Sequence, residues 1–216
     1  MKDAVEFLRS SGAEVVEVNM PMKGEINASS FQVMLYEFKD GLNSYFASLG
    51  DKAPVKNIEE LIEFNKKDSI ELRFFDQQLL EMAQLKEGLD DPKYKQALAL
   101  MQKGTREEGI DKVMNSNKLD ALVAPTGGPA WKTDLVNGDN FLGSSSSFAA
   151  ISGYPNITVP MGFISELPVG ISFFGRAWSE PVLLEIAYAF EQGTKHRKAP
   201  KYLNYVMLKS KKEKRK

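Results

Sequence analysis

Apolar residues recur every three or four positions through the middle of the chain, which is the period of an amphipathic helix. The pattern is most regular over residues 29–49, and Gly50 follows it as a typical helix terminator. Asn57 with the acid Glu60 three positions later is typical of a helix N-terminus. We expect helices over residues 29–49, from Asn57 to Phe64, near residues 70–87, and from Asp91-Pro92 to Met114.

The beginning of the chain predicts a helix followed by a strand. Apolar residues on one helical face precede Gly12, and the β-branched run from Glu14 to Val18 ends before Pro21. β-Structure returns only after Lys118, as apolar runs bounded by turn residues. We expect strands over residues 14–18, 119–124, 157–159 and 169–174, and a last helix from Ser179 to Gly193.

Residues 125–156 differ from the segments around them, because they are rich in Gly, Ser, Asn and Pro and have no sustained period. This segment is longer than a connection between two elements normally needs to be. Long loops of this kind are usually functional or mobile, and binding residues are common in them. We therefore expect candidate binding residues here.

Composition adds limits to this picture. The chain of 216 residues is 43% apolar, which is enough for a hydrophobic core, and its formal net charge is −1. Residues 195–216 hold ten Lys and Arg residues against one acid, so a basic end follows an acidic body. Without cysteine or a membrane-spanning apolar run, we expect a soluble, cytoplasmic protein. With His196 as the single histidine, we expect no metal and no cofactor.

Several short motifs occur in a recognisable order after residue 118. They are Leu119-Asp-Ala-Leu-Val-Ala-Pro-Thr126, Gly143-Ser-Ser-Ser-Ser147, Gly153-Tyr-Pro155, Ile157-Thr-Val-Pro-Met-Gly162 and Leu167-Pro-Val-Gly-Ile-Ser-Phe-Phe-Gly-Arg176. Each motif alone is weak, but the ordered set resembles the amidase-signature family. The loop motifs Pro129-Ala-Trp131 and Asp134-Leu-Val-Asn-Gly-Asp139 are most similar to the peptide-amidase-like branch, and the glutamyl-tRNA amidotransferase branch fits less well.

The resemblance implies an α/β fold in which a mixed β-sheet is covered by helices, as part of the amidase-signature fold. It implies that residues 1–208 are the carboxy-terminal portion of such a domain, and we expect residues 209–216 to be a basic disordered tail. Members of the family hydrolyse carboxylic amides, either linear amides or peptide amides, with a serine, a second serine on a cis peptide bond, and a lysine. This triad lies in a Gly/Ser-rich signature that is absent here, so we assign no catalytic residue and expect the fragment to be inactive alone.

The long loop contains our candidate substrate-binding residues, Trp131, Asp139, Asn140 and Phe141. Aromatic side chains with a few polar groups suit a substrate pocket. The alternative is a simple turn at Asn137-Gly138, and only the resemblance favours the pocket.

Two other sets of residues are weaker candidates for a catalytic role. The four hydroxyls at residues 144–147 suggest a nucleophile, yet a run of serines more often satisfies backbone groups at a turn or helix start. His196 lies among basic neighbours that disfavour a protonated imidazole, so we interpret it as a surface residue.

The expected partners follow from these interpretations. In the complete enzyme the partner is a small-molecule or peptide amide substrate, and no membrane is involved. The alternative to an amidase fragment is a non-catalytic module that forms a homodimer or complements a separate amino-terminal fragment. Apolar residues on both faces of strands 157–159 and 169–174 favour such association. The basic tail could bind nucleic acid, but it lacks interleaved aromatic residues, so we consider nucleic acid an unlikely partner.

Overall fold

A three-stranded antiparallel sheet is the centre of one of two units in the computed structural model, which describes residues 1–202. The sheet unit consists of Met1–Met20 and the chain from Thr105 onward, and the helical unit consists of Pro21–Gly104. Each unit is described by itself below. The expected tail at residues 209–216 lies outside the described residues.

The strands of the sheet unit are β1 (Leu122–Pro125), β2 (Asn156–Ile164) and β3 (Leu167–Phe174), in the order β1-β3-β2. Strands β2 and β3 form a hairpin in which Asn156 pairs with Phe174. Strand β1 pairs with the other side of β3, with Leu122 opposite Phe174. The three later strands expected from the sequence are therefore present, and they lie in one sheet.

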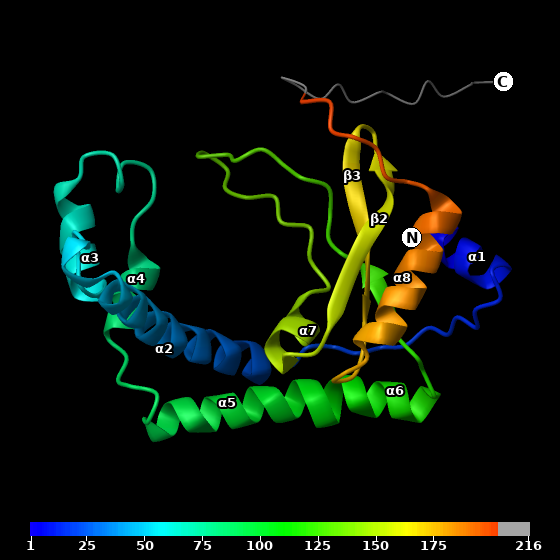
Figure 1. Cartoon of the computed structure of the whole chain (residues 1–216), viewed down its shortest axis with the longest axis horizontal. Coiled ribbons are helices and arrows are strands. Elements are labelled where there is room, and N and C mark those ends of the chain that lie inside the picture. The colour runs from blue at the N-terminus through cyan, green and yellow to red at the C-terminus, as the bar shows by residue number, and fades with distance from the viewer. Residues whose placement is uncertain (203–216) are drawn as a thin grey trace. The chain divides into compact units, whose positions relative to one another are not determined.

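Helices cover this sheet through apolar side chains. They are α1 (Lys2–Ser10), α6 (Asp111–Asn117), α7 (Ser147–Ser152) and α8 (Glu180–Thr194). Helix α8 packs on β2 and β3 (Figure 1), where Phe190 meets Phe173 with ring centroids 5.8 Å apart. Helix α1 places Phe7 against Phe190, and Gly193 provides the space, because a Cβ there would overlap the Phe7 ring.

The strand predicted at residues 14–18 is absent from the structure, so this prediction is wrong. These residues form no regular element, although three of the five are valines and they lie in the sheet unit. The reason is that a strand requires a paired neighbour, and within residues 1–202 the backbone amides of residues 14–18 make no hydrogen bond to another backbone group. The sequence therefore predicts the extended conformation but not its pairing.

The helical unit contains α2 (Gly24–Ser48), the short 3₁₀ helix η1 (Gly50–Lys52), α3 (Ile58–Lys67), α4 (Gln78–Gln84) and α5 (Pro92–Thr105). Leu35, Ile58, Ile62 and Ala83 form its buried cluster. The expected cap is confirmed, because the Glu60 N–H donates to Asn57 Oδ1 at 2.9 Å. The Glu60 carboxylate accepts instead from the Lys56 N–H at 2.8 Å, one residue earlier than the reciprocal bond of a capping box.

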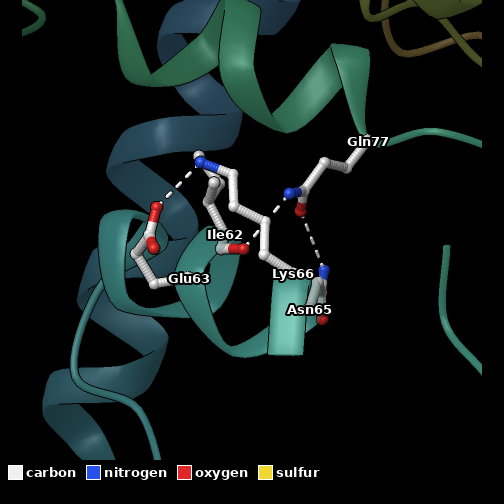
Figure 2. Close-up of polar contacts among 5 residues, drawn as sticks. All are labelled: Ile62, Glu63, Asn65, Lys66 and Gln77. Carbon is white, nitrogen blue, oxygen red and sulfur yellow. Dashed lines mark hydrogen bonds and ion pairs between the residues drawn. The ribbon is translucent and has the colours of Figure 1, made fainter. Parts of the chain in front are cut away.

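The helix expected near residues 70–87 is wrong in length, because only Gln78–Gln84 is helical. The Asp68 carboxylate accepts hydrogen bonds from the Ile70 and Glu71 N–H groups, and such a local turn competes with helix formation. Figure 2 shows how the following segment is held: the buried Gln77 side chain donates to Ile62 O at 3.1 Å. The Gln77 side-chain oxygen accepts from Asn65 at 3.2 Å, so α3 and the start of α4 are joined by an amide pair.

The helix expected from Asp91-Pro92 to Met114 is continuous only in part. A π-helical segment, η2 (Arg106–Ile110), separates α5 from α6, and Gly109 lies outside helical geometry at φ −104° and ψ −105°. Helix α2 also begins at Gly24, earlier than expected, and α7 falls within residues that show no period.

The α/β class is confirmed, with helices around a small antiparallel sheet. No helix within residues 1–202 is both long enough and apolar enough to cross a membrane.

Candidate functional site

The loop after β1 is closed at its base, where Gly127 and Ser144 form an antiparallel bridge. The Ser145 N–H also donates to Thr126 O at 3.3 Å. Gly128 allows the two arms to approach, because a Cβ there would lie 2.7 Å from Leu142 Cβ. Figure 1 shows the chain running out from the sheet after β1 and returning to α7. Backbone contacts therefore hold the two ends of the loop together next to the sheet.

The structure brings three of the four candidate binding residues together in this loop. The Trp131 Nε1–H donates to Asp139 Oδ1 at 3.3 Å, and the Trp131 and Phe141 rings meet edge to face at 6.1 Å. Asn140 lies exposed between Asp139 and Phe141. Trp131 is 41% exposed and Phe141 is 67% exposed, so the aromatic pair presents apolar surface to the solvent. The cluster is open and can receive a ligand from outside.

The expected turn is also present, next to the aromatic pair. Asp134 Oδ1 accepts from the Val136 and Asn137 N–H groups at 2.9 Å, and Gly138 has a φ of +80°. Hydrogen bonds from the Asn137 backbone and side chain, with that from Val136, lower the pKa of Asp134. The turn reverses the chain between Trp131 and Asp139 and so allows their side chains to meet.

A row of three hydroxyls lies where the loop leaves the sheet, and the sequence did not indicate it. Thr126 Oγ1 lies 2.6 Å from Thr158 Oγ1 and 2.8 Å from Ser172 Oγ. Gly170 leaves room for this row, because a Cβ there would lie 2.7 Å from Thr126 Oγ1. Thr126, Thr158 and Ser172 occur within the motifs, but only the strand register brings them together. The row runs from buried Ser172 to exposed Thr158 and can offer hydrogen bonds to a ligand.

Within the serine run, Ser144 joins the loop to the start of α7, whereas the buried Ser145 hydroxyl has no partner among the described residues. Ser144 Oγ donates to Thr126 O at 3.2 Å and accepts from the Ser146 N–H at 3.2 Å, and Ser146 is the N-cap of α7. The two hydroxyls also bond to each other at 2.9 Å. No lysine, histidine or carboxylate of the described chain takes part in these contacts. His196 follows the end of α8 and is partly exposed.

The aromatic pair with Asp139 offers apolar surface and a carboxylate, and the hydroxyl row at the sheet offers hydrogen bonds. Neither group includes a hydroxyl held against a general base, which nucleophilic catalysis requires. Within residues 1–202, no group of three or more His, Asp or Glu side chains could hold a metal ion.

Comparison with known proteins identifies the family, because the model of the Amidase family matches residues 1–184. The chain belongs to the amidase-signature family. The resemblance found in the motifs after residue 118 is therefore confirmed, and the amidase match also includes the helical unit.

Individual amidases are similar over nearly the whole of this chain. The crystal structure of native peptide amidase from Stenotrophomonas maltophilia is 44% identical with a TM-score of 0.84, over 92% of this chain and 40% of that one. A probable amidase of Arabidopsis thaliana is 36% identical, over 92% of this chain and 37% of its own. A glutamyl-tRNA(Gln) amidotransferase polypeptide of Methanosarcina barkeri is 28% identical, over 92% and 42%. The greater similarity to peptide amidase agrees with the loop motifs, and the chain spans about two fifths of the length of these relatives.

Proposed function

We propose that this chain is part of an amidase that hydrolyses linear carboxylic amides, including peptide amides, and that its long loop forms one wall of the substrate site. The observation that carries the proposal is the cluster of Trp131, Asp139 and Phe141 in a chain 44% identical to a peptide amidase. Aromatic rings can cover the side chains of a peptide substrate, and the Asp139 and Asn140 side chains can accept its N–H groups.

The catalytic groups of the active enzyme come, in this proposal, from outside these 216 residues. Amide hydrolysis needs an activated nucleophile, a proton donor for the leaving amine and donors for the oxyanion. Among the described residues, the Ser144 and Ser146 hydroxyls bond only to each other and to backbone groups, so nothing in their contacts activates them. The chain on its own is therefore expected to release no ammonia from amides.

Two measurements test the proposal. The first is ammonia release from a carboxy-terminally amidated peptide by the purified chain, where turnover that disappears in Ser144→Ala would contradict the proposal. The second uses a chimera in which this chain replaces the matched segment of the Stenotrophomonas maltophilia peptide amidase. An active chimera is expected, because the two segments share 44% identity and the same fold.

In the chimera, Trp131→Ala and Phe141→Ala should each raise KM about tenfold, because each removes aromatic contact surface. Val136→Ala is the matched control, since Val136 is in the same loop and is 91% exposed. An active chimera whose KM is unchanged by both aromatic substitutions would exclude this loop from substrate binding.

A further inference from the structure

An open groove of about 1260 Å³ lies in the sheet unit between residues 13–18 and β1. Its lining includes apolar side chains of α1, of both walls, of β3 and of α8, among them Val5, Leu8, Val16, Phe173 and Ile186. Val16 is 44% exposed. Charged side chains, among them Glu6, Arg9, Glu17 and Lys118, also line the groove, so its surface is mixed. The apolar part of the lining is unfavourable in contact with water and favours an occupant that covers it.

One wall of the groove is the free edge of β1. Within the described residues, strand β1 pairs only with β3, and the Thr126 N–H donates to Gly170 O at 2.9 Å at the end of this ladder. In an antiparallel pair, alternate residues direct their N–H and C=O groups to opposite sides. Ala124 therefore bonds toward β3, in phase with Thr126, whereas the N–H and C=O of Val123 face the groove.

The opposite wall is the segment 14–18, which has the sequence of a strand but no strand partner within residues 1–202. In that part of the chain, the only hydrogen bond to its backbone comes from the Arg9 guanidinium, which donates to Val15 O at 3.2 Å. Both ends of the segment are held, because α1 packs on α8 through Phe7 and because Val18 packs on the cluster around Leu122. Two sets of unpaired backbone groups thus border the same groove.

From this arrangement we infer that the groove receives one β-strand, which pairs with residues 14–18 on one side and with the Val123 edge of β1 on the other. The strand comes from the remainder of an amidase, and this assignment of its source depends on the proposed function. The chain spans only 40% of the peptide amidase length, yet it keeps the fold of that protein with a TM-score of 0.84. A strand that places apolar residues against Val5, Leu8 and Ile186 suits the groove.

The other edge strand of the sheet, β2, is less suited than β1 to pairing with an added strand. Strand β2 contains Pro160, which has no N–H to donate, and a bulge follows between Pro160 and Gly162. Proline and bulges are features that prevent an edge strand from pairing with another chain. Strand β1 also ends in a proline, Pro125, but it has no bulge. Val123 keeps both an N–H and a C=O directed away from β3, so it is the position of β1 at which an added strand can pair.

The experiment is coexpression of the full 216-residue chain with the part of the Stenotrophomonas maltophilia peptide amidase that lies outside the matched region. A one-to-one complex is expected by sedimentation. Amide exchange at Val123 and Val16 should slow about tenfold or more relative to the chain alone, because these N–H groups become bonded. Exchange at Ala124 should change less, because its N–H is already directed toward β3.

Two substitutions check the pairing without depending on each other. Val16→Pro removes an N–H from a segment that belongs to no regular element, so folding should be unaffected. Val123→Pro removes the corresponding N–H of β1. Each should weaken the complex about tenfold, whereas Val16→Thr and Val123→Thr keep the N–H and should bind normally.

The possible results separate this inference from the proposed function. A complex that leaves exchange at Val123 and Val16 unchanged, or no complex at all, overturns the strand inference. A dimer of this chain with both amides protected overturns the assigned source, because the occupant is then a second copy. Protection of both amides in the one-to-one complex supports the inference even if no ammonia is released, and that result would count against the proposed function alone.

Discussion

In the sheet unit the first and last helices meet through apolar rings, whereas in the helical unit α2 and the start of α5 are joined by side-chain hydrogen bonds as well as by a contact between two tyrosine rings. Phe7 and Phe173 both pack on Phe190. In the helical unit, by contrast, the Tyr36 hydroxyl donates to Asp91 and the Tyr94 hydroxyl donates to Glu37. The two units should therefore respond differently to apolar truncation, to the removal of hydrogen bonds and to acid.

Lysine contacts add to the polar character of the helical unit. The Lys39 ammonium donates to Gln84 O at 2.9 Å and also to Lys86 O. The Lys86 ammonium donates to Gln32 Oε1 at 2.6 Å. These bonds tie α2 to the end of α4 and the chain after it, because a charged donor can satisfy carbonyls that end a helix.

The largest effect is expected for Phe190→Ala in the sheet unit. Phe190 is 1% exposed and contacts two other rings, so its truncation should lower the free energy of unfolding of this unit by about 3–5 kcal/mol. Tyr188→Ala on the exposed face of α8 is the control and should change it by less than about 0.5 kcal/mol. Urea unfolding followed by amide exchange in each unit is the measurement. Equal losses of protection in α2 and α8 would mean that the units unfold together and would remove the contrast.

Glycine substitutions in two helices should have opposite signs. Gly193→Ala would place a methyl group on the Phe7 ring and should cost about 1–3 kcal/mol. Gly41→Ala lies within α2 with no atom within 4 Å of the new Cβ, so it should stabilise by about 0.5–1 kcal/mol. Thermal unfolding of both variants gives the test. If Gly193→Ala also stabilised the protein, the contact between α1 and α8 would be loose.

Removal of the Gln77 side chain should affect the helical unit. Gln77→Ala removes two side-chain hydrogen bonds, one to Ile62 O and one from Asn65, and each such bond contributes about 0.5–1.5 kcal/mol. The neighbouring Gln78→Ala is the control, because Gln78 is exposed. Urea unfolding monitored by amide exchange in α3 should show the difference, and equal stability of the two variants would mean that water replaces the Gln77 contact.

These contacts show what could be predicted from the sequence. The cap at Asn57 was predictable because donor and acceptor are three residues apart. The strands were predictable from β-branched runs, but the register of Leu122 with Phe174 was not, because pairing joins segments with no local signal. The late start of α4 at Gln78 was missed because the Asp68 turn competes with helical periodicity.

Part of the candidate site could also be predicted from the sequence, and part could not. The composition of the loop and the family resemblance together predicted Trp131, Asp139 and Phe141, and these three side chains do meet. The hydroxyl row of Thr126 and Thr158 depends on which strands are neighbours, so a single sequence could not indicate it.

The smallest expected effect is a sensitivity to acid in the helical unit. The Tyr36 hydroxyl donates to Asp91 Oδ2 at 2.5 Å, and this bond, with one from the Lys93 N–H, lowers the pKa of Asp91. A carboxyl whose pKa is lower in the folded state stabilises the protein above its unfolded pKa, and the contribution is lost as pH falls through the folded pKa. The helical unit should thus lose stability in acid through Asp91.

Asp91→Asn should reduce this dependence, and Asp90→Asn, on the exposed neighbour, is the control. Unfolding midpoints measured from neutral to acidic pH compare the two variants. Identical pH profiles of Asp91→Asn and the unchanged protein would show that the tyrosine bond does not contribute.

The contact between Phe7 and Phe190 has a consequence for the order of folding during synthesis on the ribosome. The two rings belong to the first and last helices of the described chain, so nearly the whole chain must be made before they can meet. Pro21–Gly104 is one continuous segment and can complete its own contacts earlier. Because contacts between distant residues are slow to form, the nascent chain should hold α1 without a partner while the helical unit is already folded. That interval is when a chaperone would have most to bind.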